Sequence, residues 1–169
     1  MYFSTIQQFA HTLKNLDAIL DKAVKHAEAK KFDPNNFCTA RLAPDMLPFP
    51  RQIQIACDVA KTGAAMLCGK DAPKHEDNEQ TMAQLRERIR KCLNFLETVK
   101  AEDMKSVNAK TVLKMPYPAG KAMYAEEALL SRVVPNFFFH VMTTYAILRA
   151  GGVDIGKADF LGNLNMFDA

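Results

Sequence analysis

Four polar residues share one narrow stripe in an otherwise apolar segment near the end of the chain. Placed about 100° apart per residue, positions 136–149 are apolar on every side except where Asn136, His140, Thr143 and Thr144 align. An unpaired polar group in a buried helix costs on the order of 1–3 kcal/mol. These side chains must therefore face one another, water, a partner subunit or a ligand. His140 has the chemistry for general acid or base catalysis near neutral pH.

A second polar stripe follows Pro50, where another helix is predicted to begin. Gln54 and Asp58 are four residues apart and Lys61 is three further on, so the three stack on one side. The stripe is either the solvent face with an Asp58–Lys61 surface pair, or a wall that looks across a cavity at His140, or a subunit interface. In the cavity arrangement, Asp58 would fix the tautomer of His140, which makes these two the candidate catalytic residues.

The loop before this helix places Arg41 and Asp45 on either side of Pro44. Loops held by a rigid scaffold often carry binding groups, although the two charges could equally pair locally and pin the loop. Tyr145 is expected near the same site. The candidate ligand-binding residues are Arg41, Asp45, Gln54, Asp58, Asn136, His140, Thr144 and Tyr145.

Established catalytic and metal motifs are missing from the sequence. It has no HExxH, no Glu-x-x-His, no Cys/His cluster at zinc spacing, no GxSxG, no Walker loop and no GxGxxG. The four cysteines form no CxxC pair, and Cys57, Cys68 and Cys92 fall on apolar faces, where cysteine packs as a small hydrophobe. The sequence therefore indicates one candidate polar site but no particular type of reaction.

Apolar residues at steps of three and four predict the helices that position this site. The first helix would begin at Ser4, capped with Gln7, and run for roughly 25 residues. The second would run from Pro50 to about Cys68 and stop at Gly69. The third would span about 78–99, with a cap formed by Asp77 and Gln80, and its basic residues at 86–91 would form a solvated face. The intervening segment 70–77 would be a polar linker, with His75 as an exposed loop residue.

The last third of the chain changes period. Alternation around Leu113 and Met115, followed by Pro118-Ala-Gly, predicts a short β-hairpin before the last helix. That helix would begin near Glu126 and either kink or divide at Pro135. The apolar tail 153–169 is expected to pack back on the bundle. Residues 1–169 are thus predicted to form a single all-α domain, a four-helix bundle with a short hairpin.

Composition limits the class of protein. The chain has 169 residues, 49% hydrophobic and 24% charged, with a net charge of +3 that is spread evenly. This balance predicts neither nucleic-acid binding nor attachment to an anionic membrane. No apolar run approaches the roughly 20 residues that span a bilayer, and the first ten residues do not look like a signal peptide. We therefore expect a cytoplasmic protein.

Four runs resemble an uncharacterised bacterial family that is grouped with the DinB-like (YfiT-like) metalloenzymes. They are Arg41-Leu-Ala-Pro-Asp-Met, Arg51-Gln-Ile-Gln-Ile-Ala, Pro135-Asn-Phe-Phe-Phe-His-Val and Gly156-Lys-Ala-Asp-Phe-Leu-Gly. The resemblance covers nearly the whole chain. It implies a DinB-like four-helix bundle in an up-down-down-up arrangement, often a homodimer.

The wider group typically holds zinc or nickel with three histidines, one on the second helix and two on the fourth. This sequence departs from that pattern, because Gln54 and Asp58 stand where a histidine is expected and His140 is alone on its helix. A full three-histidine site is not expected. His140 is the single metal-ligand candidate that carries over, with Asp58 and Gln54 able to complete only a weaker site.

The predicted function is binding of a small molecule in a polar pocket between the second and last long helices, by a chain that forms a homodimer. One alternative is a divergent metal-dependent enzyme, thiol-transferase-like or isomerase-like, with a divalent zinc or nickel ion as cofactor. Another is a non-catalytic structural or interaction protein, whose polar stripe only fixes the register of the helices.

Overall fold

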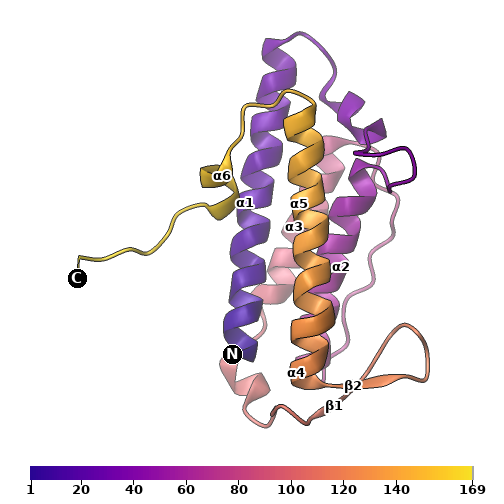
Figure 1. Cartoon of the computed structure of the whole chain (residues 1–169), viewed down its shortest axis with the longest axis vertical. Helices are drawn as coiled ribbons and strands as arrows, with labels where there is room; N and C mark the ends of the chain where they lie inside the picture. Colours follow the sequence, from indigo (N-terminus) through magenta and orange to yellow (C-terminus); the bar gives the residue numbers. More distant parts are fainter. Residues whose placement is uncertain (169) are drawn as a thin grey trace.

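The computed structural model describes residues 1–168, and the helices pack side by side as an up-down-down-up bundle (Figure 1). Its long helices are α1 (Tyr2–Ala29), α2 (Phe49–Cys68), α3 (Met82–Glu97) and α5 (Val134–Ala150). α2 contacts both α3 and α5, and α1 packs mainly on α3. The predicted all-α architecture is confirmed.

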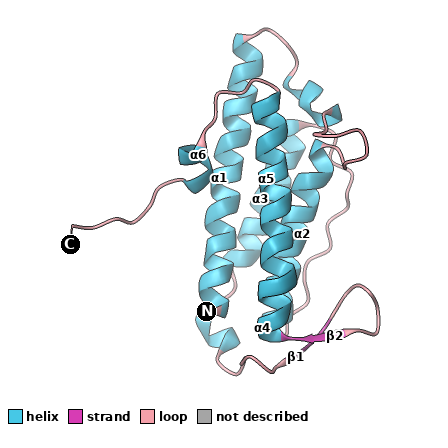
Figure 2. Cartoon of the chain, in the orientation of Figure 1, coloured by secondary structure: helices cyan, strands magenta, loops and turns pink. Residues whose placement is uncertain are grey.

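Short elements connect and close the bundle. A 3-10 helix, η1 (Pro34–Thr39), precedes α2, and another, η2 (Ala101–Met104), follows α3. The predicted hairpin consists of β1 (Val112–Lys114) and β2 (Ala122–Tyr124), antiparallel, at one end of the bundle (Figure 2). α2 and α3 run in the same direction. Residues 69–81, which connect them, therefore return along the length of the bundle (Figure 1).

Two of the predicted helix starts are wrong. α1 begins at Tyr2 without a side-chain cap, so Ser4 lies inside the helix. α3 begins four residues later than predicted, at Met82, where Thr81 and Gln84 form the capping box. Asp77 cannot serve as that cap, because its carboxylate is engaged by arginines of α2 and α3. The predicted stop of α2 is confirmed, since Gly69 adopts the left-handed conformation with φ 63°.

The helical run that contains Pro135 is not broken. α4 (Ala125–Ala128) continues through one π-helical segment, η3 (Leu129–Val133), directly into α5. Proline has no backbone N–H and clashes with the carbonyl four residues before it. The π segment, which ends two residues before Pro135, accommodates the proline because its wider turn relaxes the ordinary helical spacing.

The core fills the space between the four long helices. Phe9 of α1 and Phe137 of α5 are fully buried, with ring centroids 4.4 Å apart. Cys57 and Cys92 are also fully buried, and the Cys92 thiol donates to the Cys57 carbonyl at 3.3 Å. Contact with Cys92 and burial raise the pKa of the Cys57 thiol. Both cysteines therefore pack as hydrophobes, as the sequence predicts.

The C-terminal segment divides into two parts. Val153 and Ile155 are buried, and α6 (Lys157–Leu161) lies against α1. Residues 162–168, here called the C-terminal arm, extend away from the bundle (Figure 1). The prediction that the tail packs back is correct to residue 161 and wrong for the arm, while Ala169 lies outside the described residues. No helix in residues 1–168 has the length and apolarity required to cross a membrane.

Candidate functional site

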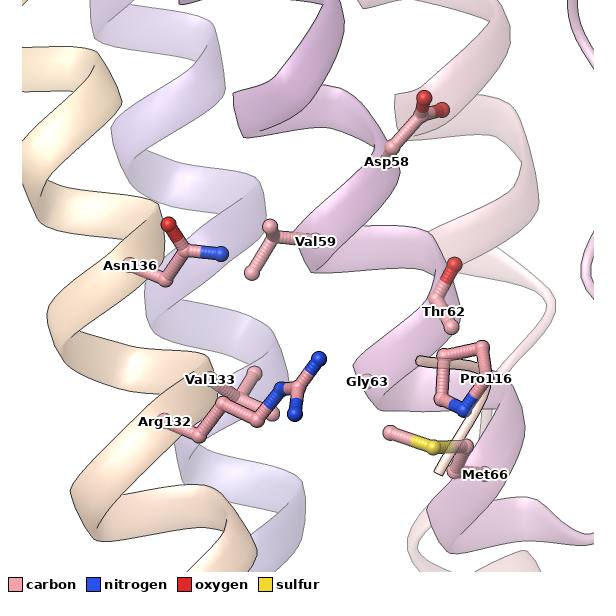
Figure 3. Close-up of a pocket in the computed structure, with 9 residues that line it drawn as sticks. All are labelled: Asp58, Val59, Thr62, Gly63, Met66, Pro116, Arg132, Val133 and Asn136. Carbon is pink, nitrogen blue, oxygen red and sulfur yellow. The ribbon is translucent and has the colours of Figure 1, made fainter. Parts of the chain in front are cut away.

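A pocket of about 190 Å³ lies between α2 and the η3–α5 helix (Figure 3). The hairpin contributes Pro116 to its edge. Its apolar wall is formed by Val59, Gly63, Met66 and Val133, and its polar groups are Asp58, Thr62, Arg132 and Asn136. We call this cavity the α2/α5 pocket. Two of the predicted site residues, Asp58 and Asn136, line it.

The π segment and a helical glycine shape this pocket. Val133, the last residue of η3, presses so closely against Gly63 of α2 that a Cβ at Gly63 would lie 2.7 Å from the Val133 Cγ1 atom. Real Cβ atoms essentially never make contacts this short. Gly63 is thus required by the close approach of the two helices, and that approach forms the floor of the pocket.

Arg132 supplies the positive charge of the pocket. Its guanidinium extends from η3 into the space between the helices, on the same side as the Asn136 side chain (Figure 3). Among residues 1–168, no carboxylate lies within salt-bridge distance of Arg132, whereas Arg51, Arg86, Arg88 and Arg90 all have such partners. An arginine offers five donors in a planar fork that suits an oxyanion. The pocket therefore presents an unneutralised anion-binding group.

His140 does not line the α2/α5 pocket. Its Nδ1 atom lies 2.7 Å from Oε1 of Gln52, which in turn donates from Nε2 to the Leu47 carbonyl at 2.8 Å. Thr144 is fully buried and donates to the His140 carbonyl, and Thr143 donates to the Phe139 carbonyl. Most of the polar stripe of α5 is thus satisfied by local bonds and by Gln52. This arrangement favours a structural role for His140.

The environment of His140 makes its charge state testable. Burial and the positive charge of Arg51 lower the pKa of His140 below its usual 6.5. Between that lowered pKa and 6.5 the unfolded chain binds a proton that the folded chain does not, so stability falls as pH falls through this window. We expect Gln52→Glu to raise the pKa of His140 above 6.5, because a carboxylate then faces Nδ1, and to reverse the sign of this contribution.

NMR titration of the His140 imidazole in both proteins checks this prediction, together with urea unfolding at pH 5.5 and 7.5. The comparison of the two proteins isolates the pair formed by residue 52 and His140, since every other titratable group is unchanged. A wild-type His140 that titrates at or above 6.5 would contradict the assigned environment.

The polar stripe of α2 faces α3 and the 69–81 segment. Asp58 Oδ1 accepts from Arg88 Nη2 and from Lys61 Nζ, both at 2.7 Å. Gln54 is buried and donates to Glu79 at 2.8 Å. The expectation that Gln54 and Asp58 look across a cavity at His140 is therefore wrong. The Asp58–Lys61 pair does exist, but Lys61 is buried, so the stripe is not a plain solvent face either.

Arg88 is the centre of these contacts and is only 1% exposed. It donates to Asp58, Asp77, Glu79 and the Glu76 carbonyl, a set we call the Arg88 network. Burial opposes the charged form, but Asp58 and Glu79 keep the pKa of Arg88 above its usual value. Arg88 Nε is the one buried side-chain polar atom without a partner in the described part of the chain. The prediction that Arg88 belongs to a solvated face is wrong.

The same contacts hold the 69–81 segment against the helices. His75 is half-buried, with Nδ1 3.4 Å from Lys61 Nζ. Burial, Lys61 and Arg88 lower the pKa of His75. The predicted polar linker is therefore a strap that covers the Arg88 network, and the prediction that His75 is an exposed loop residue is wrong.

The other predicted site residues lie elsewhere. Arg41 is exposed and donates to the Pro44 carbonyl at 3.4 Å, and within residues 1–168 it forms no salt bridge with Asp45. Tyr145 donates to the Ile155 carbonyl and packs on Phe160, so it anchors the C-terminal segment. None of Arg41, Asp45, Gln54, His140, Thr144 and Tyr145 lines the α2/α5 pocket.

The residues present do not fit a metal site. Residues 1–168 contain no group of three His, Cys, Asp or Glu side chains placed to hold an ion. His140 is paired with a neutral amide, and Asp58 is bonded to two cations. A carboxylate already held by an arginine and a lysine is a poor metal ligand, so the weaker His140–Asp58–Gln54 site does not form.

Sequence reasoning missed Arg132, Thr62, Gln52 and Arg88. Arg132 carried a usable signal, because it lies four residues before Asn136 and eight before His140, in the direction of the same stripe. Arg88 also carried a usable signal. The carboxylates at 58, 76, 77 and 79 need a nearby cation, and that cation must lie close to the apolar stripe of α3. Gln52 and Thr62 had no distinguishing pattern.

Comparison with known proteins is consistent with this fold. The model of a domain of unknown function, DUF1993, matches residues 1–161. The crystal structure of a DinB family member protein from Shewanella denitrificans is similar, with 42% sequence identity and a TM-score of 0.93, over 99% of this chain and 95% of that chain. Among curated proteins, none matches the chain. The DinB-like fold implied by the four sequence runs is confirmed.

Proposed function

The chain belongs to the DUF1993 family and has a DinB-like fold, and we propose that it binds a small organic acid in the α2/α5 pocket. The observation that carries the proposal is Arg132, a half-buried arginine that extends into the pocket and has no carboxylate partner in residues 1–168. The anionic group of the ligand would supply that partner. Asn136 and Thr62 would donate to its remaining oxygens.

The shape and charge of the pocket limit the ligand. A volume of about 190 Å³ accepts a molecule of a few carbon atoms next to its acidic group. Val59, Met66 and Val133 favour an apolar chain. Asp58 is already bonded to Lys61 and Arg88, so Arg132 is the one cation among the lining residues and matches a single negative charge. We therefore expect a monoanion with a short aliphatic group, held without a metal.

A thermal-shift series tests the proposal. Propionate, butyrate and hexanoate are compared with their neutral amides of the same size, because a ligand that binds only the folded state raises Tm. We expect the acids to raise Tm and the amides to have little effect. Arg132→Gln should abolish the shift, because the amide side chain cannot neutralise the anion.

Arg90→Gln is the matched control, since Arg90 is an exposed arginine of α3 whose partner is Glu87. It should keep the full response to the acids. Failure of every acid to raise Tm, or an equal response in Arg132→Gln, would overturn the proposal.

We also propose that the chain forms a homodimer. Exposed apolar side chains support it at two places, at Phe139 and Met142 on α5 and in the C-terminal arm. Sedimentation velocity of the full chain should give the mass of two chains at micromolar concentration. A mass of one chain at every concentration would reject the homodimer.

A further inference from the structure

The C-terminal arm begins at a fixed point on α1. Upstream of the arm, α6 is held by a 2.6 Å ion pair between Asp159 and Lys22. Asn15 Nδ2 donates to the Phe160 carbonyl at 3.1 Å, and His11 Nε2 lies 2.8 Å from the Leu161 carbonyl. The origin of the arm is therefore set by several bonds to one helix.

Gly162 then turns the chain away from its own bundle. Its φ of 67° lies in the region that favours glycine, and a Cβ at this position would overlap the side chain of Asn15. Beyond this turn the arm leads outward (Figure 1). Its apolar side chains, Leu164, Met166 and Phe167, are 49%, 84% and 90% exposed. Three such side chains in a seven-residue arm need a surface that this copy of the chain does not supply.

A groove with apolar side chains in its lining opens at the origin of the arm. It lies between α1 and the end of α3 and has a volume of about 370 Å³. Its apolar lining is Phe3, Ile6, Ala10, Leu96 and Val99, and its polar lining is Gln7, His11, Lys14, Glu97 and Lys100. His11 belongs both to the lining of this groove and to the contacts that fix α6. The arm thus starts at the rim of an apolar groove and leads away from it.

We propose that the arm of each chain docks in the α1/α3 groove of a second copy, so that two chains exchange arms. This inference rests on the proposed homodimer. In a two-fold dimer each arm starts beside its own groove, so the two grooves face one another across the axis and the two contacts are identical. Residues 163–168 span about 20 Å when extended, which is enough to cross such an interface.

Charge complementarity also supports docking of the arm in the α1/α3 groove. The groove carries Lys14 and Lys100 against one carboxylate, Glu97, which Lys14 already holds at 3.3 Å. The arm carries one charged side chain, Asp168. An acidic residue at the end of an apolar peptide therefore meets a groove with a surplus of positive charge.

Sedimentation velocity of full-length variants tests the exchange. We expect the wild-type chain to be a dimer. A chain ending at Gly162, Phe167→Asp and Ala10→Glu should each weaken dimerisation at least tenfold. Far-UV circular dichroism should stay unchanged, because residues 163–168 do not belong to the packed core and Ala10, at the edge of that core, is only half-buried and lines the groove. Val112→Asp, at an exposed apolar side chain of β1, should remain dimeric.

Mixing distinguishes docking in a second copy from docking in the same chain. A heterodimer of Phe167→Asp with Ala10→Glu retains one intact arm and one intact groove, so the mixture should dimerise more tightly than either variant alone. Absence of this rescue would overturn the exchange. A dimer that survives truncation but not Met142→Asp, on the exposed face of α5, would retain the homodimer and reject the arm, whereas a monomeric wild-type chain would reject both.

Discussion

Replacing Arg88 by methionine is expected to lower the free energy of unfolding by about 3 kcal/mol, within the range for removing one partner of a buried ion pair. Arg88 is 1% exposed and joins three carboxylates and one carbonyl. Methionine fills most of the volume but leaves those carboxylates facing one another. The loss stays near the low end because Asp58 keeps its bond to Lys61 and is itself partly exposed.

Urea unfolding at pH 7 measures the effect, with Arg86→Met as the control. Arg86 lies on the same helix and binds Asp17 and Asp21, but its side chain and both partners are about one-third exposed. Its replacement should cost only a small fraction of the loss at Arg88. The strap should also become accessible, so limited proteolysis of Arg88→Met is expected to cut within residues 69–81. Equal losses for the two variants would mean that burial does not determine how much the Arg88 network contributes to the free energy of unfolding.

Gly63→Val is expected to lower the free energy of unfolding by about 2–3 kcal/mol, the usual cost of overpacking a well-filled site. A Cβ at this position already overlaps Val133 Cγ1, and valine adds two methyl groups. Valine and Val133 are both stiff at χ1, so the contact is relieved only by moving α2 away from η3. Because Gly63 also lines the α2/α5 pocket, the variant should lose its response to organic acids.

A double-mutant cycle with Val133→Ala identifies the cause. If the Val133 methyl groups are the obstacle, the double variant is more stable than the sum of the two single losses predicts. Gly156→Val is the control, because a Cβ at Gly156 meets nothing within 4 Å. Additive losses in the cycle would show that the cost at Gly63 has another origin.

The helices could be predicted because a spacing of three and four marks a buried face without knowledge of its partner. Their starts could not be predicted with equal certainty. Asp77–Gln80 and Thr81–Gln84 have the same spacing, and the choice between them depends on the use of Asp77 by Arg51 and Arg88. That use is a tertiary contact, which local spacing does not report.

A polar pocket between α2 and α5 was expected from the two polar stripes, but most of the residues assigned to it lie elsewhere. α2 packs on both α3 and α5, so two of its faces are buried. Gln52 and Gln54 lie about 200° apart around the helix, and the polar stripe assigned to the α5 side turned out to face α3. His140 consequently pairs with Gln52. Only Asp58 and Asn136 of the predicted set line the pocket, and whether that pocket holds a ligand stays a prediction.

The π segment before Pro135 is equivalent to a one-residue insertion in a regular α-helix. Removing position 133, the last residue of the π segment, would let the rest of the run 125–150 form a regular α-helix. Every residue before the deletion would then turn by about 100° around the axis relative to α5. Arg132 would leave the pocket while Asn136 kept its place. A gap at this point in an aligned relative would therefore mark a protein that has the bundle but not the arginine in its pocket.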